Sequence, residues 1–372
     1  MKVCIDLSAL DDNFSGIERF AYSITRSLIQ IDLENKYILI FKNRVFDGLL
    51  NIIDDKRVKS VIIRWNGGKL LFNQIILKKT LNQIAADKYL FLAFPVPIFL
   101  NKPGIISTIH DMCFYDVPWT MTKRSELYYK ISDYFAVRKS QKIITISNFS
   151  KERIMARYQL NPEDIWLIYC GIDNRFLDYE QRSNSIFRDK YHLPEQYILS
   201  LSTIEPRKNL ALLVEAYDEL LREGVKVPDL VLAGRSGWKN KHLLHNISDV
   251  AKCHIRFTGF VDDADLPDVY SGATLFVFPS LYEGFGIPPL EALSVGCPVL
   301  SSDAASLPEV LDGQVHYFHS ANRESLKGKM IQILQTDYEQ PARRYASRFT
   351  WDRSASTLIR FLRGFNHDVK RC

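Results

Sequence analysis

The apolar run 274–280 (TLFVFPS) and the segment 283–291 behind it (EGFGIPPLE) decide the fold of this chain. The run is typical of a strand that is buried in a parallel sheet. The prolines at 288–289 suit the start of a helix, where the first turn leaves amide hydrogens unbonded and proline has none to offer. Together they predict a strand, a turn that carries Glu283, and a helix with Glu291 in its first turn.

The turn has the composition of a ligand site. Gly284 and Gly286 let backbone amides approach a ligand closely, and the helix start behind them favours anionic groups. No side chains at suitable spacing complete a metal site around Glu283 and Glu291, whereas a carboxylate can accept hydrogen bonds from two neighbouring sugar hydroxyls. We therefore predict a site for a polyhydroxylated, phosphorylated small molecule and no metal.

Outward from this segment, strand-like runs alternate with helix-period segments along the whole chain. We predict strands at 1–10, 36–42, 58–65, 104–110, 141–147, 197–204, 229–234, 254–261, 274–280 and 297–303. A length of 372 residues favours two domains. We predict domains at 1–180 and 190–348, with a C-terminal helix in 349–372 that crosses back to the first domain.

This pattern predicts an α/β fold with two doubly wound, Rossmann-like parallel sheets that face a cleft. Ligands bind such sheets at the carboxyl ends of the strands, and the chemically informative residues fall there. They are Gly16, His110, Asp111, Arg207, Lys208, Gly234 and Glu283.

Arg207 and Lys208 lie between the strand at 197–204 and a helix expected near Asn209. Two cations beside helix amides are suited to bind a diphosphate. A solvated basic turn is the alternative, and the expected proximity of Glu283 favours the diphosphate.

His110 ends the strand at 104–110, where its ring could donate a hydrogen bond to a sugar hydroxyl or a phosphate. A structural histidine is the alternative. Asp111 would orient His110 or cap the next segment, and Gly16 would let an anion or an acceptor approach the first helix.

The composition excludes several classes of protein. A hydrophobic share of 47% and a charged share of 24% describe an ordinary folded protein. The excess behind the net charge of +5 lies in residues 1–180, which suits a phosphorylated acceptor, an anionic membrane surface or simply a solvated surface. No dense basic cluster indicates nucleic acid, and the six cysteines show no metal or redox spacing. We expect a cytoplasmic protein without a membrane span.

Two further patterns bear on cofactors. No GxGxxG motif follows the first strand, which counts against a nicotinamide or flavin oxidoreductase. Asp263 and Asp265 could hold a divalent metal, but they precede an amphipathic segment and are interpreted as helix caps. We therefore expect no cofactor.

These segments resemble the retaining, nucleotide-sugar-dependent glycosyltransferases of family 4, which have the GT-B fold. The resemblance covers nearly the whole chain. Its motifs are SGI at 15–17, HD at 110–111, STIEPRKNLALLVEAY from 202, LVLAGRSGW from 230, RFTGFVDDADLPDVYSGATLFVFPSLYEGFGIPPLEAL from 256 and CPVLSSDAASLPEV from 297.

The resemblance implies a role for each site residue. Arg207 and Lys208 would stabilise the leaving diphosphate, with Gly234 also on the donor side. Glu283 would lie near the transferred sugar and Glu291 would bind the donor ribose. The remaining implied donor contacts are backbone groups of Gly284, Phe285, Gly286 and Ile287. His110 would lie beside the transferred sugar, and Gly16 and Asp111 on the acceptor side. Many relatives have two glycines where this chain has Ser15-Gly16, which weakens a phosphate contact there.

The family mechanism implies transfer with retention of configuration, without a metal and without a protein nucleophile. The motifs look most like bacterial mannosyltransferases of surface polysaccharide synthesis, so GDP-mannose is the first expected donor, with dTDP-rhamnose or GDP-fucose as alternatives. A saccharide or lipid-diphosphate-linked acceptor is expected. The basic, aromatic segment 123–139 would then attach peripherally to the inner membrane face, or pack in the core. A nucleotide-sugar epimerase and a non-catalytic glycan-binding subunit are the rival functions.

Overall fold

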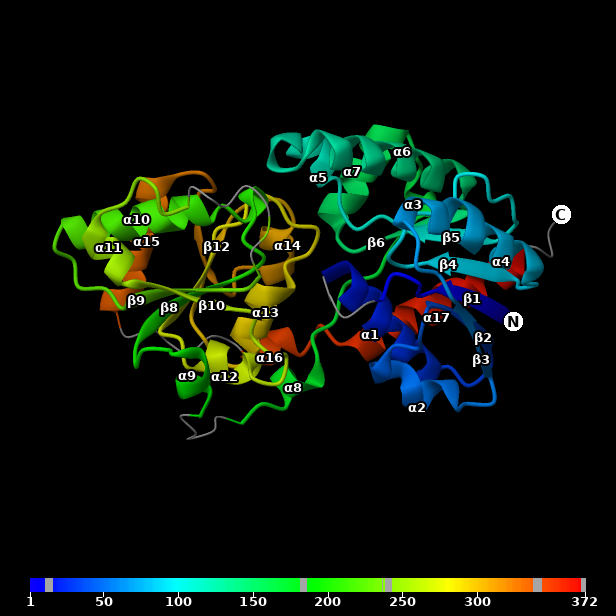
Figure 1. The fold of residues 1–372 in the computed structure, drawn as a ribbon, viewed down its shortest axis with the longest axis horizontal. Helices are drawn as coiled ribbons and strands as arrows, with labels where there is room; N and C mark the ends of the chain where they lie inside the picture. The colour runs from blue at the N-terminus through cyan, green and yellow to red at the C-terminus, as the bar shows by residue number, and fades with distance from the viewer. Residues whose placement is uncertain (11–15, 181–185, 236, 238–242, 337–342, 369–372) are drawn as a thin grey trace. The chain divides into compact units, whose positions relative to one another are not determined.

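The computed structural model describes residues 1–10, 16–180, 186–235, 237, 243–336 and 343–368 (Figure 1). The chain divides into two compact units. Unit 1 comprises Met1–Tyr115, Lys123–Gly171 and Trp351–Cys372, and unit 2 comprises Asp116–Thr122 and Ile172–Thr350. The main change of unit thus lies at 171/172, compared with the boundary expected after residue 180, and a short segment of the N-terminal half belongs to unit 2.

Unit 1 is built on a parallel sheet of seven strands in the order β3-β2-β1-β4-β5-β6-β7. The strands are β1 (Lys2–Asp6), β2 (Lys36–Lys42), β3 (Val58–Ile63), β4 (Lys88–Phe91), β5 (Ile105–Thr108), β6 (Lys142–Thr145) and β7 (Ile165–Leu167). The sequence did not predict β4 or β7, which are four and three residues long. Such short strands carry too few residues for a periodicity to show.

The helices of unit 1 connect these strands. They are α1 (Gly16–Ile31), α2 (Leu50–Ile53), α3 (Lys69–Leu71), α4 (Lys78–Gln83), α5 (Cys113–Asp116), α6 (Lys123–Lys139), α7 (Asn148–Tyr158) and α17 (Trp351–Asp368), with short helical turns at Asp47–Leu49, Phe72–Leu77 and Pro162–Asp164. Helix α17 packs along α1, so the end of the chain completes the unit in which it began.

Unit 2 repeats the plan with six parallel strands in the order β10-β9-β8-β11-β12-β13. The strands are β8 (Tyr197–Leu201), β9 (Asp229–Ala233), β10 (Ile255–Gly259), β11 (Leu275–Phe278), β12 (Val299–Ser302) and β13 (His316–Phe318). The helices are α8 (Asn174–Leu177), α9 (Ile186–Tyr191), α10 (Leu210–Arg222), α11 (Asp249–Cys253), α12 (Leu266–Ser271), α13 (Ile287–Ser294), α14 (Leu307–Leu311), α15 (Arg323–Gln335) and α16 (Arg343–Ala346), with turns at Pro118–Thr120 and Pro206–Lys208. The expected α/β class with two doubly wound parallel sheets is confirmed.

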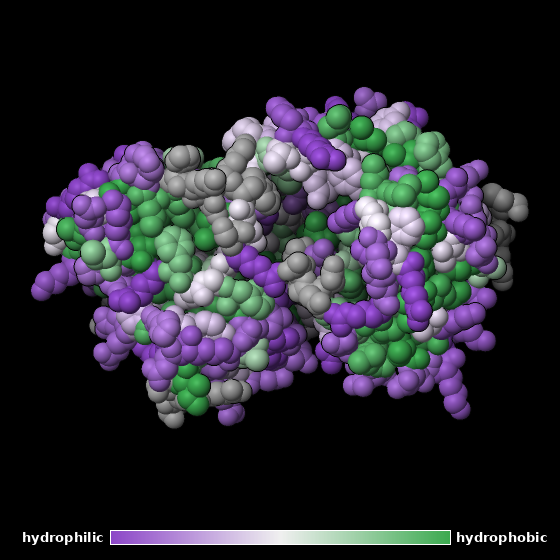
Figure 2. All heavy atoms as spheres, viewed as in Figure 1, coloured by the Kyte–Doolittle hydropathy of each residue, from purple (hydrophilic) through white to green (hydrophobic). Residues whose placement is uncertain are grey.

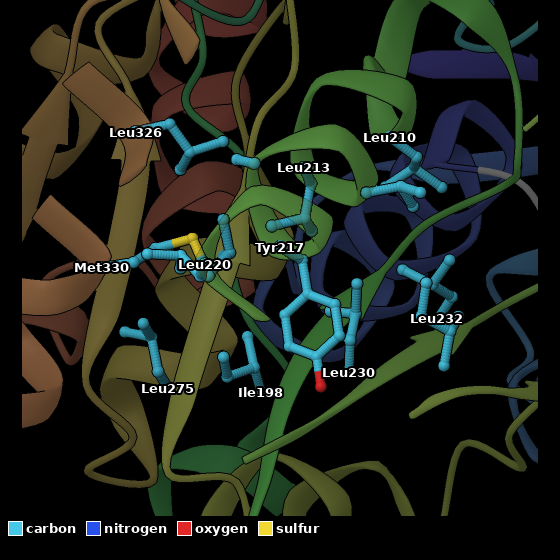
Figure 3. Packing of buried hydrophobic residues seen from close by; sticks show 14 of the residues in the cluster. Ile198, Leu210, Leu213, Tyr217, Leu220, Leu230, Leu232, Leu275, Leu326 and Met330 are labelled. Carbon is cyan, nitrogen blue, oxygen red and sulfur yellow. The ribbon is translucent and has the colours of Figure 1, made fainter. Parts of the chain in front are cut away.

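One hydrophobic core of unit 2 lies between its sheet and the helices α10, α11 and α15 (Figures 1 and 3). Leu213, Tyr217 and Leu220 follow one another at three- and four-residue spacing, so α10 presents one apolar face to the strands. Tyr217 is fully buried, and its hydroxyl donates to the Pro228 carbonyl over 3.0 Å, which satisfies its one polar atom. The packing fixes α10, and with it the turn that precedes the helix.

Helix α13 begins one residue earlier than predicted, at Ile287. Gly286 precedes it with a φ of 99°, a conformation that a side chain would strain. The prediction that Glu291 lies in the first turn is therefore wrong: it is the fifth helical residue and opens the second turn. The prolines at 288–289 do occupy the first turn, as their missing amide hydrogens allow.

Candidate functional site

The strand order of unit 2 brings the two predicted donor segments together. The connections reverse direction between β8 and β11, which lie side by side with Leu275 paired to Ile198. The turn at Arg207 and Lys208 follows β8, and Glu283 follows β11. In doubly wound sheets a ligand crevice forms at this reversal, outside the carboxyl ends of the strands.

The three charged side chains meet there directly. The Lys208 Nζ donates to Glu283 Oε1 over 2.6 Å, and the Arg207 Nη1 donates to Glu283 Oε2 over 3.1 Å. Glu205 binds the other side of the guanidinium, with Arg207 Nη2 at 2.9 Å from its Oε1. The cluster thus holds two cations and two carboxylates in a charge-balanced arrangement.

Serines fix the loop around Glu283. The Ser280 hydroxyl donates to Glu283 Oε1 over 2.5 Å, and the Ser306 hydroxyl approaches the carbonyls of Glu283 and Phe285 at 2.9 and 3.1 Å. All three loop residues are buried. The carboxylate is therefore held by side chains from both sides of its own loop before any ligand binds.

Burial and charge oppose each other at this site. Burial alone would raise the pKa of Glu283, but the charges of Lys208 and Arg207 and the hydrogen bonds from Lys208 and Ser280 lower it to about 2. Burial and the neighbouring Arg207 charge lower the pKa of Lys208, while Glu283 counters both. Glu283 is thus a fixed anion at neutral pH and cannot act as a general acid. Lys208 keeps two ammonium hydrogens beyond the one bonded to Glu283, counting the contacts of the described residues.

The glycine and aromatic positions around the site have structural reasons. Gly234 has a φ of 129°, and a Cβ there would lie 2.0 Å from the Ser202 carbonyl oxygen, so the loops after β8 and β9 could not approach as they do. Phe285 is buried with its ring edge-on to Phe349 at 5.8 Å, so its side chain supports the loop. Gly284 and Ile287 complete the turn, and the expected ligand contacts of these backbone amides stay a prediction.

Glu291 lies in a separate polar contact. It is 4% exposed and accepts a hydrogen bond from the Tyr270 hydroxyl over 3.2 Å. Arg175, whose pKa is raised first by its bond to Asp173, also feels the charge of Glu291. The structure therefore places Glu291 beside a buried phenol, and its expected ribose contact stays a prediction.

In unit 1, His110 stands at the end of β5. Its Nε2 is 2.9 Å from the Leu92 carbonyl oxygen, and Phe20 packs edge-on against the ring. Burial lowers the pKa of His110, so the ring is neutral at physiological pH. Because a carbonyl only accepts, Nε2 carries the proton and Nδ1 is an acceptor. This nitrogen could receive a hydrogen bond from a sugar hydroxyl, whereas the sequence suggested a donor.

The neighbouring acceptor-side residues are only partly described. Asp111 Oδ1 accepts from the Cys113 amide over 2.9 Å, which is the capping role rather than an orienting bond to His110. Gly16 is exposed as the first residue of α1, with open space where a Cβ would stand. Ser15 lies outside the described residues.

The expected helix caps before α12 do other work. Asp265 occupies the position before the helix without a capping bond, and instead accepts from Lys190 Nζ over 2.6 Å and from the Tyr191 hydroxyl over 2.8 Å. Asp263 lies 3.9 Å from an Arg175 nitrogen. Cationic partners thus occupy both aspartates, and the capping interpretation of Asp265 is wrong.

Sequence reasoning missed several supporting residues of the site. Ser280 and Glu205 were visible as polar residues at strand ends, but nothing in the sequence linked them to Glu283 or Arg207. Tyr282 and Asp116 form a bond between residues 166 positions apart, which no local pattern can indicate.

Two negative findings concern the described part of the chain. It contains no group of three or more His, Cys, Asp or Glu side chains that could hold a metal ion. None of its helices is long and apolar enough to cross a membrane.

The chain matches two protein families over most of its length. Residues 14–176 match Glycosyltransferase Family 4, and residues 183–348 match Glycosyl transferases group 1. O-antigen chain mannosyltransferase B of Escherichia coli is 31% identical over 261 residues, which is 68% of this chain and 68% of that protein. The serotype-specific mannosyltransferase WbdA of Escherichia coli is 31% identical over 227 residues, which is 58% of this chain but only 28% of that longer protein.

Solved structures share the fold at low sequence identity. Anabaena HepE, crystallised with UDP and glucose, superposes with a TM-score of 0.73 at 15% identity, over 98% of this chain and 100% of that one. WaaG, a glycosyltransferase involved in lipopolysaccharide biosynthesis, gives 0.68 at 19% identity, over 95% and 94%. These likenesses concern the fold alone.

Proposed function

Because the chain belongs to the glycosyltransferases of group 1 and family 4, with the GT-B fold, we propose that it moves a hexose from a nucleoside-diphosphate sugar to a saccharide with retention of anomeric configuration. It is a glycosyltransferase of the O-antigen mannosyltransferase type. The observation that carries the proposal is the Arg207–Lys208–Glu283 cluster at the strand reversal of unit 2.

The cluster suits departure of a diphosphate. When the bond between the anomeric carbon and the phosphate oxygen breaks, negative charge develops on that oxygen, and Lys208 and Arg207 are fixed cations beside it. The acceptor hydroxyl attacks the same face and gives its proton to the leaving phosphate. Glu283, held as an anion, would orient the sugar hydroxyls and the two cations. No protein nucleophile is required.

We also propose that transfer needs no metal ion. A divalent metal commonly neutralises a leaving diphosphate, and here two cationic side chains are available for that role. Asp263 and Asp265, the nearest approach to a metal pair in the sequence, already face Arg175 and Lys190.

For the donor we propose GDP-mannose, because the relatives quoted above are named mannosyltransferases. dTDP-rhamnose and GDP-fucose are the alternatives. HepE, which is known with UDP and glucose, shows that the same fold accommodates another nucleotide sugar.

A panel of nucleotide sugars tests the donor. GDP-mannose at 100 times its Kd should stabilise the protein by about 2.7 kcal/mol, because a ligand that binds only the folded state shifts the unfolding equilibrium. GDP-fucose, dTDP-rhamnose, UDP-glucose and GDP are compared by thermal shift, and product formation is followed with EDTA present. Stabilisation by a dTDP or UDP sugar alone would refute GDP-mannose, and loss of transfer in EDTA would refute metal independence.

For the acceptor we propose a lipid-linked saccharide at an anionic membrane, with α6 as the attachment face. Arg124, Leu127, Ile131, Tyr134 and Arg138 recur at three- and four-residue spacing and form one stripe. The three apolar members are 60%, 42% and 43% exposed, and both ends of the stripe are arginines. Figure 2 shows hydrophobic and hydrophilic atoms intermingled over the region labelled α6 in Figure 1.

This arrangement fits a bilayer surface better than core packing. Apolar side chains can enter the headgroup region while the arginines meet anionic lipids. The inward side of α6 is made by other residues, including the buried Ser132 and Ala136. The expected contribution of Tyr128 and Phe135 is small, since both are only partly exposed.

A double substitution tests the attachment face. Leu127→Ser with Ile131→Ser should lower binding to phosphatidylglycerol-containing vesicles about tenfold or more, because each apolar side chain contributes roughly 1–2 kcal/mol on burial. Leu33→Ser, at a leucine of unit 1 that is 77% exposed, is the matched control. Equal sedimentation of all three proteins with the vesicles would contradict the proposal, as would equal binding of the wild type to neutral phosphatidylcholine vesicles.

A further inference from the structure

The segment Asp116–Thr122, here called the strap, lies in the N-terminal half of the sequence but belongs to unit 2. It begins with the last residue of α5, six positions after His110, and contains the turn Pro118–Thr120. Thr120 is 1% exposed and its hydroxyl donates to the Val117 carbonyl over 2.7 Å. The strap is therefore an ordered part of unit 2.

The strap contacts the loop that carries Glu283. The Tyr282 hydroxyl donates to Asp116 Oδ2 over 2.8 Å, and Tyr282 is 4% exposed. The carbonyl of the same tyrosine accepts from Arg207 Nη1 over 2.8 Å. Tyr282 thus joins the strap to the guanidinium, and its next residue in the chain is Glu283.

This bond has the properties of a positioning contact. A carboxylate acceptor makes a stronger hydrogen bond than a neutral one, and the buried phenol ring has little freedom. If Asp116 releases the phenol, the Tyr282 carbonyl can shift, and the Arg207–Glu283 pair loses its fixed geometry. Displacements of about 1 Å in such pairs are enough to lower catalytic rates strongly.

We propose that Asp116 and Tyr282 are positioning residues for the reaction, holding Arg207 and Glu283 where the diphosphate leaves. The inference rests on the proposed function of that cluster. It also gives the strap a role: the chain that bears His110 is tied, through Asp116, to the loop that bears Glu283.

A double-mutant cycle tests the proposal. Tyr282→Phe and Asp116→Ala each remove the hydrogen bond and should lower kcat roughly 10- to 100-fold, the loss expected for a hydrogen bond to a charged group. The donor KM should stay within about threefold, because neither residue is proposed to touch the donor. The double variant should be no slower than the slower single variant, since both changes remove the same bond.

Two further variants separate positioning from general packing. Asp116→Asn keeps an oxygen acceptor and should retain kcat within about threefold of the wild type. Tyr217→Phe loses a comparable hydrogen bond, to Pro228 beside the amino end of β9, and should leave kcat unchanged. The thermal midpoints of Tyr282→Phe and Tyr217→Phe should agree within a few degrees, as each protein loses one hydrogen bond.

The outcomes discriminate between failures. A kcat within twofold of the wild type in Tyr282→Phe, multiplicative losses in the double variant, or losses that merely follow falling thermal midpoints would each overturn the inference. If Lys208→Ala transfers normally, the proposed function fails and the inference with it. If Lys208→Ala is inactive while Tyr282→Phe is normal, only the inference fails.

Discussion

Lys208→Ala is expected to lower kcat for glycosyl transfer by about 10²–10³-fold, the usual effect of removing one preorganised group that stabilises transition-state charge. The side chain is 13% exposed and bonds Glu283 over 2.6 Å, so its position is set before the donor binds. Since charge on the diphosphate grows as the glycosidic bond breaks, the loss should fall on kcat more than on the donor KM.

The matched control is Lys327→Ala. Lys327 is also 13% exposed and also pairs with a glutamate, Glu223, over 2.8 Å, but it lies on α15 in the core layer of the unit. Steady-state kinetics with purified proteins should give a normal kcat for this variant. A rate for Lys208→Ala within tenfold of the wild type would rule out the diphosphate assignment.

Arg207→Ala should also be severely impaired, but it is a less clean experiment. Removing the guanidinium leaves Glu205 without its 2.9 Å partner and the Tyr282 carbonyl without a donor. Buried groups without partners destabilise a fold. The Lys208 substitution disturbs fewer contacts and therefore isolates the chemistry better.

The sequence could predict the donor-side cluster because parallel strands end at a common edge. The residues after β8 and β11 were expected to meet once two alternating series had been recognised, and the bonds between Lys208, Arg207 and Glu283 fit that expectation. The predicted strands correspond to observed ones, and the residues TLFVFPS contain β11 (Leu275–Phe278).

Other features depend on contacts that no local pattern carries. The strands β4, β7 and β13 are at most four residues long, so their neighbours in the sheet, rather than their own sequences, make them strands. The pairing of Glu205 with Arg207 balances the charge of the cluster, and the Asp116–Tyr282 bond joins distant segments. Residue type alone indicates neither.

Glu283→Gln should separate binding of the diphosphate from transfer. The substitution keeps the shape of the side chain but removes the anion that Lys208 and Arg207 now share, so the cluster changes from neutral to a net positive charge. Nucleoside diphosphate should then bind as tightly as before or up to about tenfold more tightly at low salt, by the direction of the Coulomb term. Transfer should fall at least 100-fold, because the cations and the sugar lose the group that orients them.

The same variant should change how stability depends on pH. The pKa of Glu283 is lowered to about 2 in the folded protein, so its contribution to stability is complete above the ordinary glutamate pKa and disappears as the pH falls towards 2. Denaturation midpoints measured between pH 6 and pH 2 should therefore fall less steeply for Glu283→Gln than for the wild type. Glu215→Gln, at a surface partner of Arg323 that is 47% exposed, should follow the wild-type curve.

These two readouts test different parts of the argument for Glu283. Parallel pH curves for the wild type and Glu283→Gln would show that the carboxylate is not held by its cations in solution. Weaker binding of GDP by the variant, measured by calorimetry at low salt, would show that the carboxylate assists the diphosphate rather than competing for Lys208 and Arg207. Retained transfer would remove Glu283 from the mechanism, because a neutral amide cannot replace an anion whose charge fixes two cations.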